Sequence, residues 1–446
     1  YILVGLIIAI ALGVIVFRVD LQWVGVAAAC AACFTLTWNG WFVGPLRPGD
    51  VLILVALLCF VLGNPNRAFT SPPWWVKQLA LVIIVVAVVQ IYFPPDPGYL
   101  SRRIVLNATG VPVASATGTL YAANLSVAFK FIVAVAAVPL AFVGATLVDR
   151  RAVRWLAISS ATGAALSGWA AILDYFGASV STIVTGYPNL HGRQLGFSNQ
   201  PNFLAAGLVI AVPLAFWMLV SYTRRDRVIG AVSMVGIVLG VFASGSRGGA
   251  VCTVLVLAMS VVLHRRTRGY AVNLALGAVV FVGVVALAVP SFGSKLLSVT
   301  RLGGGASTQG SDSVRALVGA QGVRDFHHSP LAGIGLQASF DASQVYLQEL
   351  ASGGLLLFIG MSAYMLGAMW AAGTLIRRSE LACALLAALI IMLALDFFEG
   401  DLTDRFYYVP AAILIALMQT VRDEDGEQKD PAVGLVLESV SRRELS

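Results

Sequence analysis

The sequence predicts an all-α integral membrane protein with about 12–13 transmembrane helices. Of its 446 residues, 59% are hydrophobic and only 11% are charged, and the mean hydropathy is +0.87. A soluble domain carries roughly a quarter charged residues, so no sizeable soluble domain is expected. The apolar runs are long and continuous, which favours helices over the short alternating segments of a membrane barrel.

Each predicted transmembrane helix is an apolar run bounded by polar or turn-forming residues. A helix needs about 20 residues to cross a bilayer, so the run at 51–63 must be tilted, broken or extended at its ends. We expect one polytopic domain over 1–421 and a flexible polar tail over 422–446. The runs lie at 1–17, 22–43, 51–63, 75–93, 125–148, 153–176, 201–221, 228–246, 247–263, 270–291, 341–372, 380–398 and 407–421.

Arginines in the short connections set the predicted orientation. Cytoplasmic loops carry an excess of Lys and Arg, and the arginine clusters fall on one side if successive runs alternate in direction. That side, together with the polar tail, is therefore assigned to the cytoplasm. The clusters are Arg150, Arg151 and Arg154; Arg224, Arg225 and Arg227; Arg265, Arg266 and Arg268; and Arg377 and Arg378.

The longer connections fall on the opposite, outer side, at 94–124, 177–200 and 292–340, with a short one at 399–406. Loops longer than about 15 residues are usually functional or disordered. The connection at 292–340 starts with a glycine-rich stretch, and over 311–328 its apolar residues follow helical spacing. We expect an amphipathic helix there, which lies on the membrane surface or covers a cavity.

Arg247 is the most informative arginine on the outer side. It lies between two apolar runs in FASGSRGGAVC, where a guanidinium at membrane depth is costly. Gly245, Gly248 and Gly249 allow the close approach of a ligand. We interpret Arg247 as a guanidinium fork for a phosphate or pyrophosphate. The alternative is a helix-end arginine that reaches toward lipid phosphates.

A second polar cluster precedes the run at 201–221. Arg193 offers another guanidinium, and Gln200 and Asn202 flank Pro201, which suits the first turn of a helix. The N-terminus of such a helix favours an anion. Helix capping or an interhelical hydrogen bond is the alternative for Gln200 and Asn202.

No pair of acidic residues on the outer side has a clear metal-binding spacing. Glu399, Asp401 and Asp404 are the nearest candidates, and a solvated short loop is the simpler interpretation. We predict neither a metal nor a cofactor. A reaction outside the cell has no ATP and needs an activated donor. A lipid-linked sugar pyrophosphate meets that need, and arginines stabilise the charge that develops on such a leaving group.

Four motifs in this order resemble the O-antigen ligase and O-antigen polymerase superfamily. They are GRQLGFSNQPNFLA at 192–205, SGSRGG at 244–249, HHSPLAGIG at 327–335 and YLQELASGGLLLFIG at 346–360. The long outer loop before the last apolar runs matches as well. The resemblance covers roughly residues 125–420.

The resemblance implies a metal-independent, inverting glycosyltransferase in the bacterial cytoplasmic (inner) membrane. Members of this superfamily move a glycan from undecaprenyl pyrophosphate to lipid A–core, to another lipid-linked glycan or to a protein hydroxyl, as in lipopolysaccharide biosynthesis. It also implies that Arg193 and Arg247 bind the pyrophosphate, and that Arg315 in the outer loop contacts phosphate or sugar. Tyr346 and Gln348 are candidates for sugar contacts or for packing at a helix start.

One departure from the family pattern concerns the catalytic base. Ligases of this family carry a His-Asn pair just before the Tyr-Leu-Gln at 346–348, and the histidine activates the acceptor hydroxyl. Here those positions are Ser343 and Gln344, and a serine does not act as a general base near neutral pH. An altered chemistry or an inactive variant is the alternative to a substitute base. The candidates for a substitute base are His327, His328 and Asp341.

Because the family histidine is missing, the sequence is compatible with either a ligase or a polymerase. A transporter or flippase of an anionic lipid-linked substrate would use the same arginines, and inverted repeats are typical of such proteins. The sequence shows no such repeat, and its main mid-span charges are Lys130, Asp174 and Asp396. A purely structural membrane protein would leave the polar outer loops unexplained.

Overall fold

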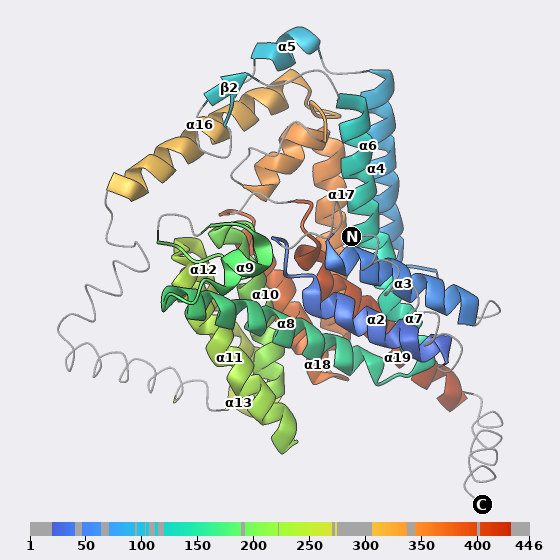
Figure 1. The fold of residues 1–446 in the computed structure, drawn as a ribbon. Coiled ribbons are helices and arrows are strands. Elements are labelled where there is room, and N and C mark those ends of the chain that lie inside the picture. The colour runs from blue at the N-terminus through green and yellow to red at the C-terminus, as the bar shows by residue number, and fades with distance from the viewer. Residues whose placement is uncertain are drawn as a thin grey trace, which may run out of the picture.

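The computed structural model confirms an all-α membrane-protein fold, with one small hairpin added (Figure 1). The predicted apolar runs at 1–17 and 270–291 lie outside the residues that the structure describes. The described residues are 20–40, 47–63, 71–93, 96–102, 104–106, 112–114, 120–188, 192–221, 223–269, 273, 306–336, 344–398 and 402–429.

The helices follow the predicted apolar runs closely. They are α2 (Leu21–Thr35), α3 (Pro48–Gly63), α4 (Trp74–Tyr92), α5 (Pro97–Arg102), α6 (Leu120–Ile132), α7 (Val138–Val148), α8 (Ala152–Tyr175), α9 (Val180–Thr185), α10 (Pro201–Leu219), α11 (Arg224–Ser244), α12 (Arg247–Leu263), α13 (Arg265–Arg268), α16 (Ala306–His328), α17 (Val345–Leu375), α18 (Glu380–Leu395) and α19 (Val409–Lys429).

Three shorter elements complete the described chain. A π-helical turn, η1 (Val133–Ala137), joins α6 to α7, and a 3-10 turn, η2 (Arg405–Tyr408), precedes α19. Strands β1 (Ile104–Leu106) and β2 (Pro112–Ala114) form an antiparallel hairpin. The hairpin lies in the long connection at 94–124, for which the sequence predicted no strands.

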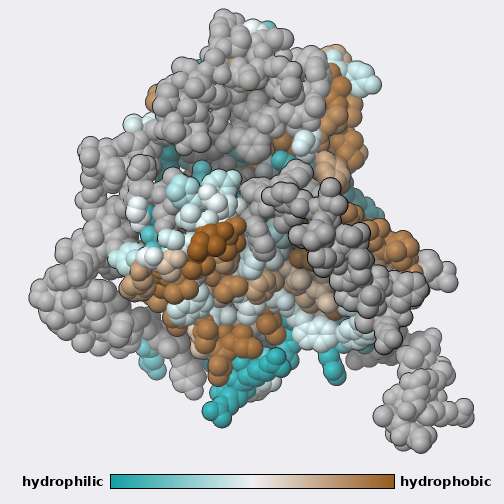
Figure 2. All heavy atoms as spheres, in the orientation of Figure 1, coloured by the Kyte–Doolittle hydropathy of each residue, from teal (hydrophilic) through white to brown (hydrophobic). Residues whose placement is uncertain are grey.

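Many of the helices have the length and composition of membrane spans. In the described part of the chain, six helical segments are long and apolar enough to cross a bilayer, and four shorter helices are also apolar. Large apolar side chains point outward, as lipid contact requires; Leu81, Val254 and Trp370 are more than half exposed. Figure 2 shows these apolar surfaces in brown, with hydrophilic residues gathered at the lower end. The chain is therefore a multi-pass membrane protein.

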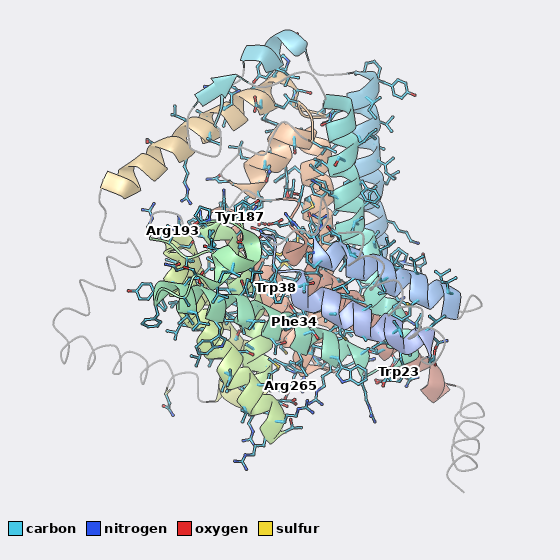
Figure 3. The ribbon with its side chains drawn as sticks, viewed as in Figure 1. Trp23, Phe34, Trp38, Tyr187, Arg193 and Arg265 are labelled. Atoms are coloured by element: carbon cyan, nitrogen blue, oxygen red, sulfur yellow. The ribbon has the colours of Figure 1, made fainter. Side chains whose placement is uncertain are left out.

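The basic connections meet at one end of the helices. The Arg154 guanidinium pairs with Asp226 at the start of α11, and Arg265 donates to the carbonyl oxygen of Arg377 at 3.1 Å. Figure 3 shows Arg265 at this end and Arg193 toward the opposite end. The clustering agrees with a shared side for these loops, and the assignment of this side to the cytoplasm stays a prediction.

The last helix extends beyond the predicted end of the transmembrane domain at residue 421. Helix α19 continues through Lys429, with a Gln419–Asp423 hydrogen bond of 2.8 Å at the favourable i, i+4 spacing. Arg378 also pairs with Asp425 at 2.8 Å. The first part of the predicted tail is therefore helical, because it is anchored to the preceding bundle.

Helix α16 lies across the predicted outer end of the molecule (Figure 1). It confirms the helix predicted over 311–328, and it begins a few residues earlier, at Ala306. Tyr99 of α5 holds its C-terminal end, because the Tyr99 hydroxyl donates to Asp325 at 2.8 Å. At Gly322, an added Cβ would lie 2.8 Å from the Leu347 side chain, so α16 packs directly on the first turn of α17.

Helix α17 is broken at Gly354, whose φ of 64° and ψ of −160° are not helical. Backbone groups released by the break pair with the segment 330–335, which joins two of the sequence motifs into one unit. The pairs are Ile334 N–Ala351 O (2.9 Å), Gly335 N–Ser352 O (3.2 Å), Leu355 N–Pro330 O (2.8 Å) and Leu356 N–Leu331 O (3.2 Å).

Gln90 of α4 clamps the same junction. Its Nε2 donates to the carbonyl oxygens of Ala332 and Ser352, both at 2.7 Å, and its Oε1 accepts from Leu336 N at 3.1 Å. Gln90 is 2% exposed, so these bonds satisfy buried polar groups that lipid would leave unpaired. These hydrogen bonds of Gln90 hold the orientation of the first turns of α17 relative to α16.

The tip of the α2–α3 hairpin also reaches the outer half of the molecule. Trp38 Nε1 donates to Gly163 O in α8 at 2.9 Å, and its ring packs edge-on against Phe197 at a centroid distance of 4.8 Å. Gly40 N donates to Phe197 O at 2.9 Å. The N-terminal part of the chain, which the sequence presented only as generic spans, therefore supports the motif at 192–205.

Candidate functional site

Arg193 is held between two helices at the predicted outer end (Figure 3). Its Nε donates to the carbonyl oxygen of Ser244 at 2.8 Å, and its Nη2 donates to Asn202 Oδ1. The guanidinium therefore bridges the last residue of α11 and the first turn of α10. Such a fixed, half-buried guanidinium presents a defined charge at a helix N-terminus.

Arg247 is the first residue of α12. Ser246 caps this helix, since its Oγ accepts from Gly249 N at 3.2 Å. A Cβ added to Gly249 would lie 2.7 Å from the Ala205 side chain, so only glycine allows α12 to approach α10 this closely. The N-terminal ends of α10 and α12 thus meet, and each brings backbone N–H groups and a helix dipole to the same region.

A cleft of about 490 Å³, called here the α16–α17 cleft, opens between α16, the start of α17 and the turn after α18. Small residues of α16 face two phenylalanines across it, and Arg315 is the charged residue of its lining. Such a surface suits an apolar chain that ends in a phosphate. The lining consists of Arg315, Ala316, Gly319, Ala320, Val323, Gln344, Leu347, Phe397 and Phe398.

The cleft adjoins the start of α12. A Cβ added to Gly248 would lie 3.0 Å from Phe398 Cβ, so Phe398 separates the cleft from the turn that carries Arg247. Ser244, which binds Arg193, lies in the same turn. The segments that carry Arg193, Arg247 and Arg315 therefore follow one another along one edge, and these residues are called the arginine strip below.

The other candidate substrate-binding residues differ in their surroundings. Gln200 is the exposed N-cap residue of α10 and makes no side-chain capping bond. Asn202 binds Arg193, as described above. The Tyr346 hydroxyl donates to Leu393 O at 2.7 Å, and Gln348 Oε1 accepts from Leu402 N at 3.1 Å. Tyr346 and Gln348 thus pack α17 against its neighbours, which is the alternative the sequence left open.

The two histidines of α16 lie far from Arg315 along the same helix. The His328 ring stacks on Tyr99 with a centroid distance of 3.8 Å. Because Arg315 and His328 belong to one continuous α-helix, they lie about 20 Å apart along its axis. His327 is exposed beside His328. Neither histidine therefore lies beside Arg315, and Asp341 and Ser343 lie outside the described residues.

Asp396 is a carboxylate that sequence reasoning named only as a mid-span charge. Its backbone oxygen accepts from Val345 N at 2.9 Å, so it lies beside the start of α17, and Val345 follows Ser343 by two positions in the sequence. It is 5% exposed, and among the described residues its Oδ1 has no hydrogen-bond partner. Its neighbour Phe397 lines the α16–α17 cleft. A buried polar atom without a partner needs an explanation, and a ligand or proton-transfer role supplies one.

The described part of the turn before α19, residues 402–406, is buried, so the interpretation as a solvated loop is wrong for Asp404. Glu399 and Asp401 lie outside the described residues. Asp404 is 0% exposed and pairs with Arg47. Arg405, which also falls in this predicted outer connection, forms a bidentate ion pair with Asp50 at 2.9 and 3.0 Å. Sequence reasoning missed these pairs because their partners come from the α2–α3 hairpin, more than 350 positions earlier.

These features define a multi-pass membrane protein with an apolar cleft bordered by arginines. Residues 232–357 match the family model described as O-antigen ligase. The match confirms the family that the motifs predicted, and it supports an O-antigen-ligase-like membrane glycosyltransferase. It includes Arg247 and Arg315 but not Arg193. A comparison with curated proteins gives no match.

Proposed function

We propose that this protein transfers a glycan from a polyprenyl (undecaprenyl) pyrophosphate donor to an acceptor hydroxyl at the outer face of the bacterial cytoplasmic membrane. The observation that carries the proposal is Arg193, held between Ser244 O and Asn202 where the N-termini of α10 and α12 meet. The α16–α17 cleft next to it has room for the lipid-proximal part of such a donor.

In the proposed reaction, the arginine strip stabilises the pyrophosphate leaving group. As the glycosyl bond to pyrophosphate breaks, negative charge grows on the departing phosphate oxygen. Arg193 and Arg247, together with the dipoles of α10 and α12, favour that charge, and Arg315 adds a contact from the covering helix. These groups supply the electrostatic stabilisation that a metal provides in other transferases.

The transfer itself is a single displacement with inversion. The acceptor oxygen attacks the anomeric carbon from the side opposite the pyrophosphate. A new carbon–oxygen bond forms, the bond to the pyrophosphate oxygen breaks, and the hydroxyl proton passes to a protein base. The lipid pyrophosphate leaves with its electron pair, and no cofactor takes part.

For the base we propose Asp396, with Asp341, which precedes the start of α17 in the sequence, as the alternative. Asp396 supports this role through its position beside Val345 and its Oδ1, which has no partner among the described residues. A general base must lie within hydrogen-bond reach of the proton that it accepts. We favour Asp396 over His327 and His328, because the axis of α16 places the two histidines roughly 20 Å from Arg315.

The test uses purified protein in lipid nanodiscs with an undecaprenyl-pyrophosphate oligosaccharide and candidate acceptors, with products read by mass. We expect Arg193→Ala and Arg247→Ala to reduce transfer by about 100-fold or more, since each removes a donor to the leaving group. Arg225→Ala, an exposed arginine at the opposite end, is the matched control and should retain full activity. Normal transfer by both outer variants would refute the proposal.

The acceptor that receives the glycan distinguishes a ligase from a polymerase. Lipid A–core and a second lipid-linked glycan are supplied in separate reactions. A product on lipid A–core identifies a ligase, and a longer lipid-linked glycan identifies a polymerase. Uptake of the donor into vesicles without any transfer product would instead support a transporter.

A further inference from the structure

The tip of the α2–α3 hairpin makes a polar contact with the segment that leads into α10. Asn39 is 0% exposed, and its Oδ1 accepts from Ser198 Oγ at 2.6 Å and from Asn199 N at 3.3 Å. On its other side, Asn39 Nδ2 donates to Asp404 Oδ2. The buried Asn39 amide thus joins two segments that are more than 200 positions apart in the sequence. Its oxygen accepts from one segment, and its nitrogen donates to the other.

Ion pairs fix the hairpin against the turn that carries Asp404. Arg47 donates to Asp404 Oδ1, and the Arg405 guanidinium binds both oxygens of Asp50. The Asp404 and Arg405 side chains are 0% and 7% exposed, so water screens these pairs weakly. Breaking such a buried network is costly, because it leaves charged groups without partners.

The contacted segment lies directly before the candidate donor site. Ser198 and Asn199 precede Gln200, the N-cap of α10, and the first turn of α10 carries the Asn202 that binds Arg193. Displacement of 198–199 would therefore move Asn202 and release one of the hydrogen bonds that hold Arg193.

We infer that Asn39 is a positioning residue for donor binding: through Ser198 and Asp404 it holds the start of α10, and with it Asn202 and Arg193, in place. This role rests on the proposed function. It assigns a part in the reaction to the N-terminal hairpin, which lies outside the segment that matches the family model. The hairpin need not touch the substrate to act in this way.

The hydrogen bond between the Asn39 amide and the Asp404 carboxylate can be tested by swapping these two side chains between the two positions. Asn39→Asp places two carboxylates against each other, and Asp404→Asn removes the charge that binds Arg47 and Asn39. The double variant Asn39→Asp/Asp404→Asn restores complementarity. The carboxylate at 39 accepts from Ser198 and Asn199, and the amide at 404 donates to it while its oxygen accepts from Arg47.

Two readouts are measured for each variant in nanodiscs: hydrogen–deuterium exchange of the peptide 192–205, and the KM values for lipid-linked donor and for acceptor. Each single variant should speed exchange in this peptide and raise the donor KM by about tenfold or more, with acceptor KM unchanged. The double variant should return both to within about threefold of the natural protein. Asp226→Asn, which removes the partner of Arg154 at the opposite end, is the control and should change neither.

The inference is overturned if either single variant leaves both readouts unchanged, or if the double variant is as impaired as the singles. An equal rise in donor and acceptor KM would also overturn it, since general loosening of the fold would then suffice. A natural protein that transfers no glycan would refute the proposed function alone, and the exchange measurement would still decide whether Asn39 holds the start of α10.

Discussion

Whether a buried or half-buried arginine of this protein can bind a ligand depends on the groups that its guanidinium already contacts. Arg193 and Arg405 both fall in predicted outer connections, and contacts of different kinds hold them. Arg193 donates to the carbonyl oxygen of Ser244 and to Asn202, whereas Arg405 forms a bidentate ion pair with Asp50. A guanidinium that a carboxylate holds bidentately has little left for an anionic ligand, so Arg405 is a structural arginine.

The base of the proposed reaction gives a prediction at this scale. We expect Asp396→Asn to lower kcat by about 100-fold or more with the donor KM nearly unchanged, because an amide cannot accept the proton. His328→Ala should keep kcat within about threefold, because that ring stacks on Tyr99, far from Arg315. Steady-state kinetics of both variants test the assignment. A large loss in His328→Ala with none in Asp396→Asn would return the role to the histidine.

Among the helices, α17 is the one whose conformation shapes the site. Its break at Gly354 lets the segment 330–335 pair with it, and Gln90 completes the hydrogen bonds of the junction. The first turns of α17 then lie under α16 and border the cleft. Without the break, an uninterrupted helix would carry these residues along a different path.

The break predicts unequal effects of two alanine substitutions in the same helix. At Gly354 the φ of 64° is unfavourable for alanine, and its Cβ would lie 2.4 Å from Leu331 backbone atoms. We expect Gly354→Ala to lower the free energy of unfolding by roughly 2–3 kcal/mol. Gly373→Ala, with no atom within 4 Å of the added Cβ, should be neutral or stabilising. Thermal unfolding in detergent compares the two, and equal effects would contradict the importance of the break.

The whole molecule has two chemically different ends. One gathers the arginine-rich connections, and the other carries α16, the cleft and the arginine strip. The positive-inside rule uses such an asymmetry to orient a membrane protein, and on that rule we predict that the proposed reaction takes place at the outer face.

Cysteine labelling tests the orientation. The described native cysteines are buried or half-buried, so background labelling should be low. We expect Leu331→Cys, at a position 66% exposed, to react with a membrane-impermeant maleimide in intact spheroplasts. Arg378→Cys, where the side chain is 56% exposed at the opposite end, should react only after the membrane is disrupted. The reverse pattern would place the arginine strip in the cytosol and exclude the proposed donor chemistry.

The sequence by itself determined the class of the protein, the position of most helices and the order of the family motifs. These properties are local, because the length and hydrophobicity of a run decide whether it forms a helix in lipid. The helix-start signal at Pro201 was readable for the same reason.

Only the tertiary structure decided which polar side chains form hydrogen bonds or ion pairs within the protein and which can bind a ligand. Tyr346 and Gln348 were candidates for sugar contacts in the sequence, and each proves to bind a distant segment. The break at Gly354 and the bridge at Asn39 likewise depend on partners far along the chain. A buried hydrogen bond or ion pair requires two groups to meet in space, and a linear pattern does not record which groups the packing of helices brings together.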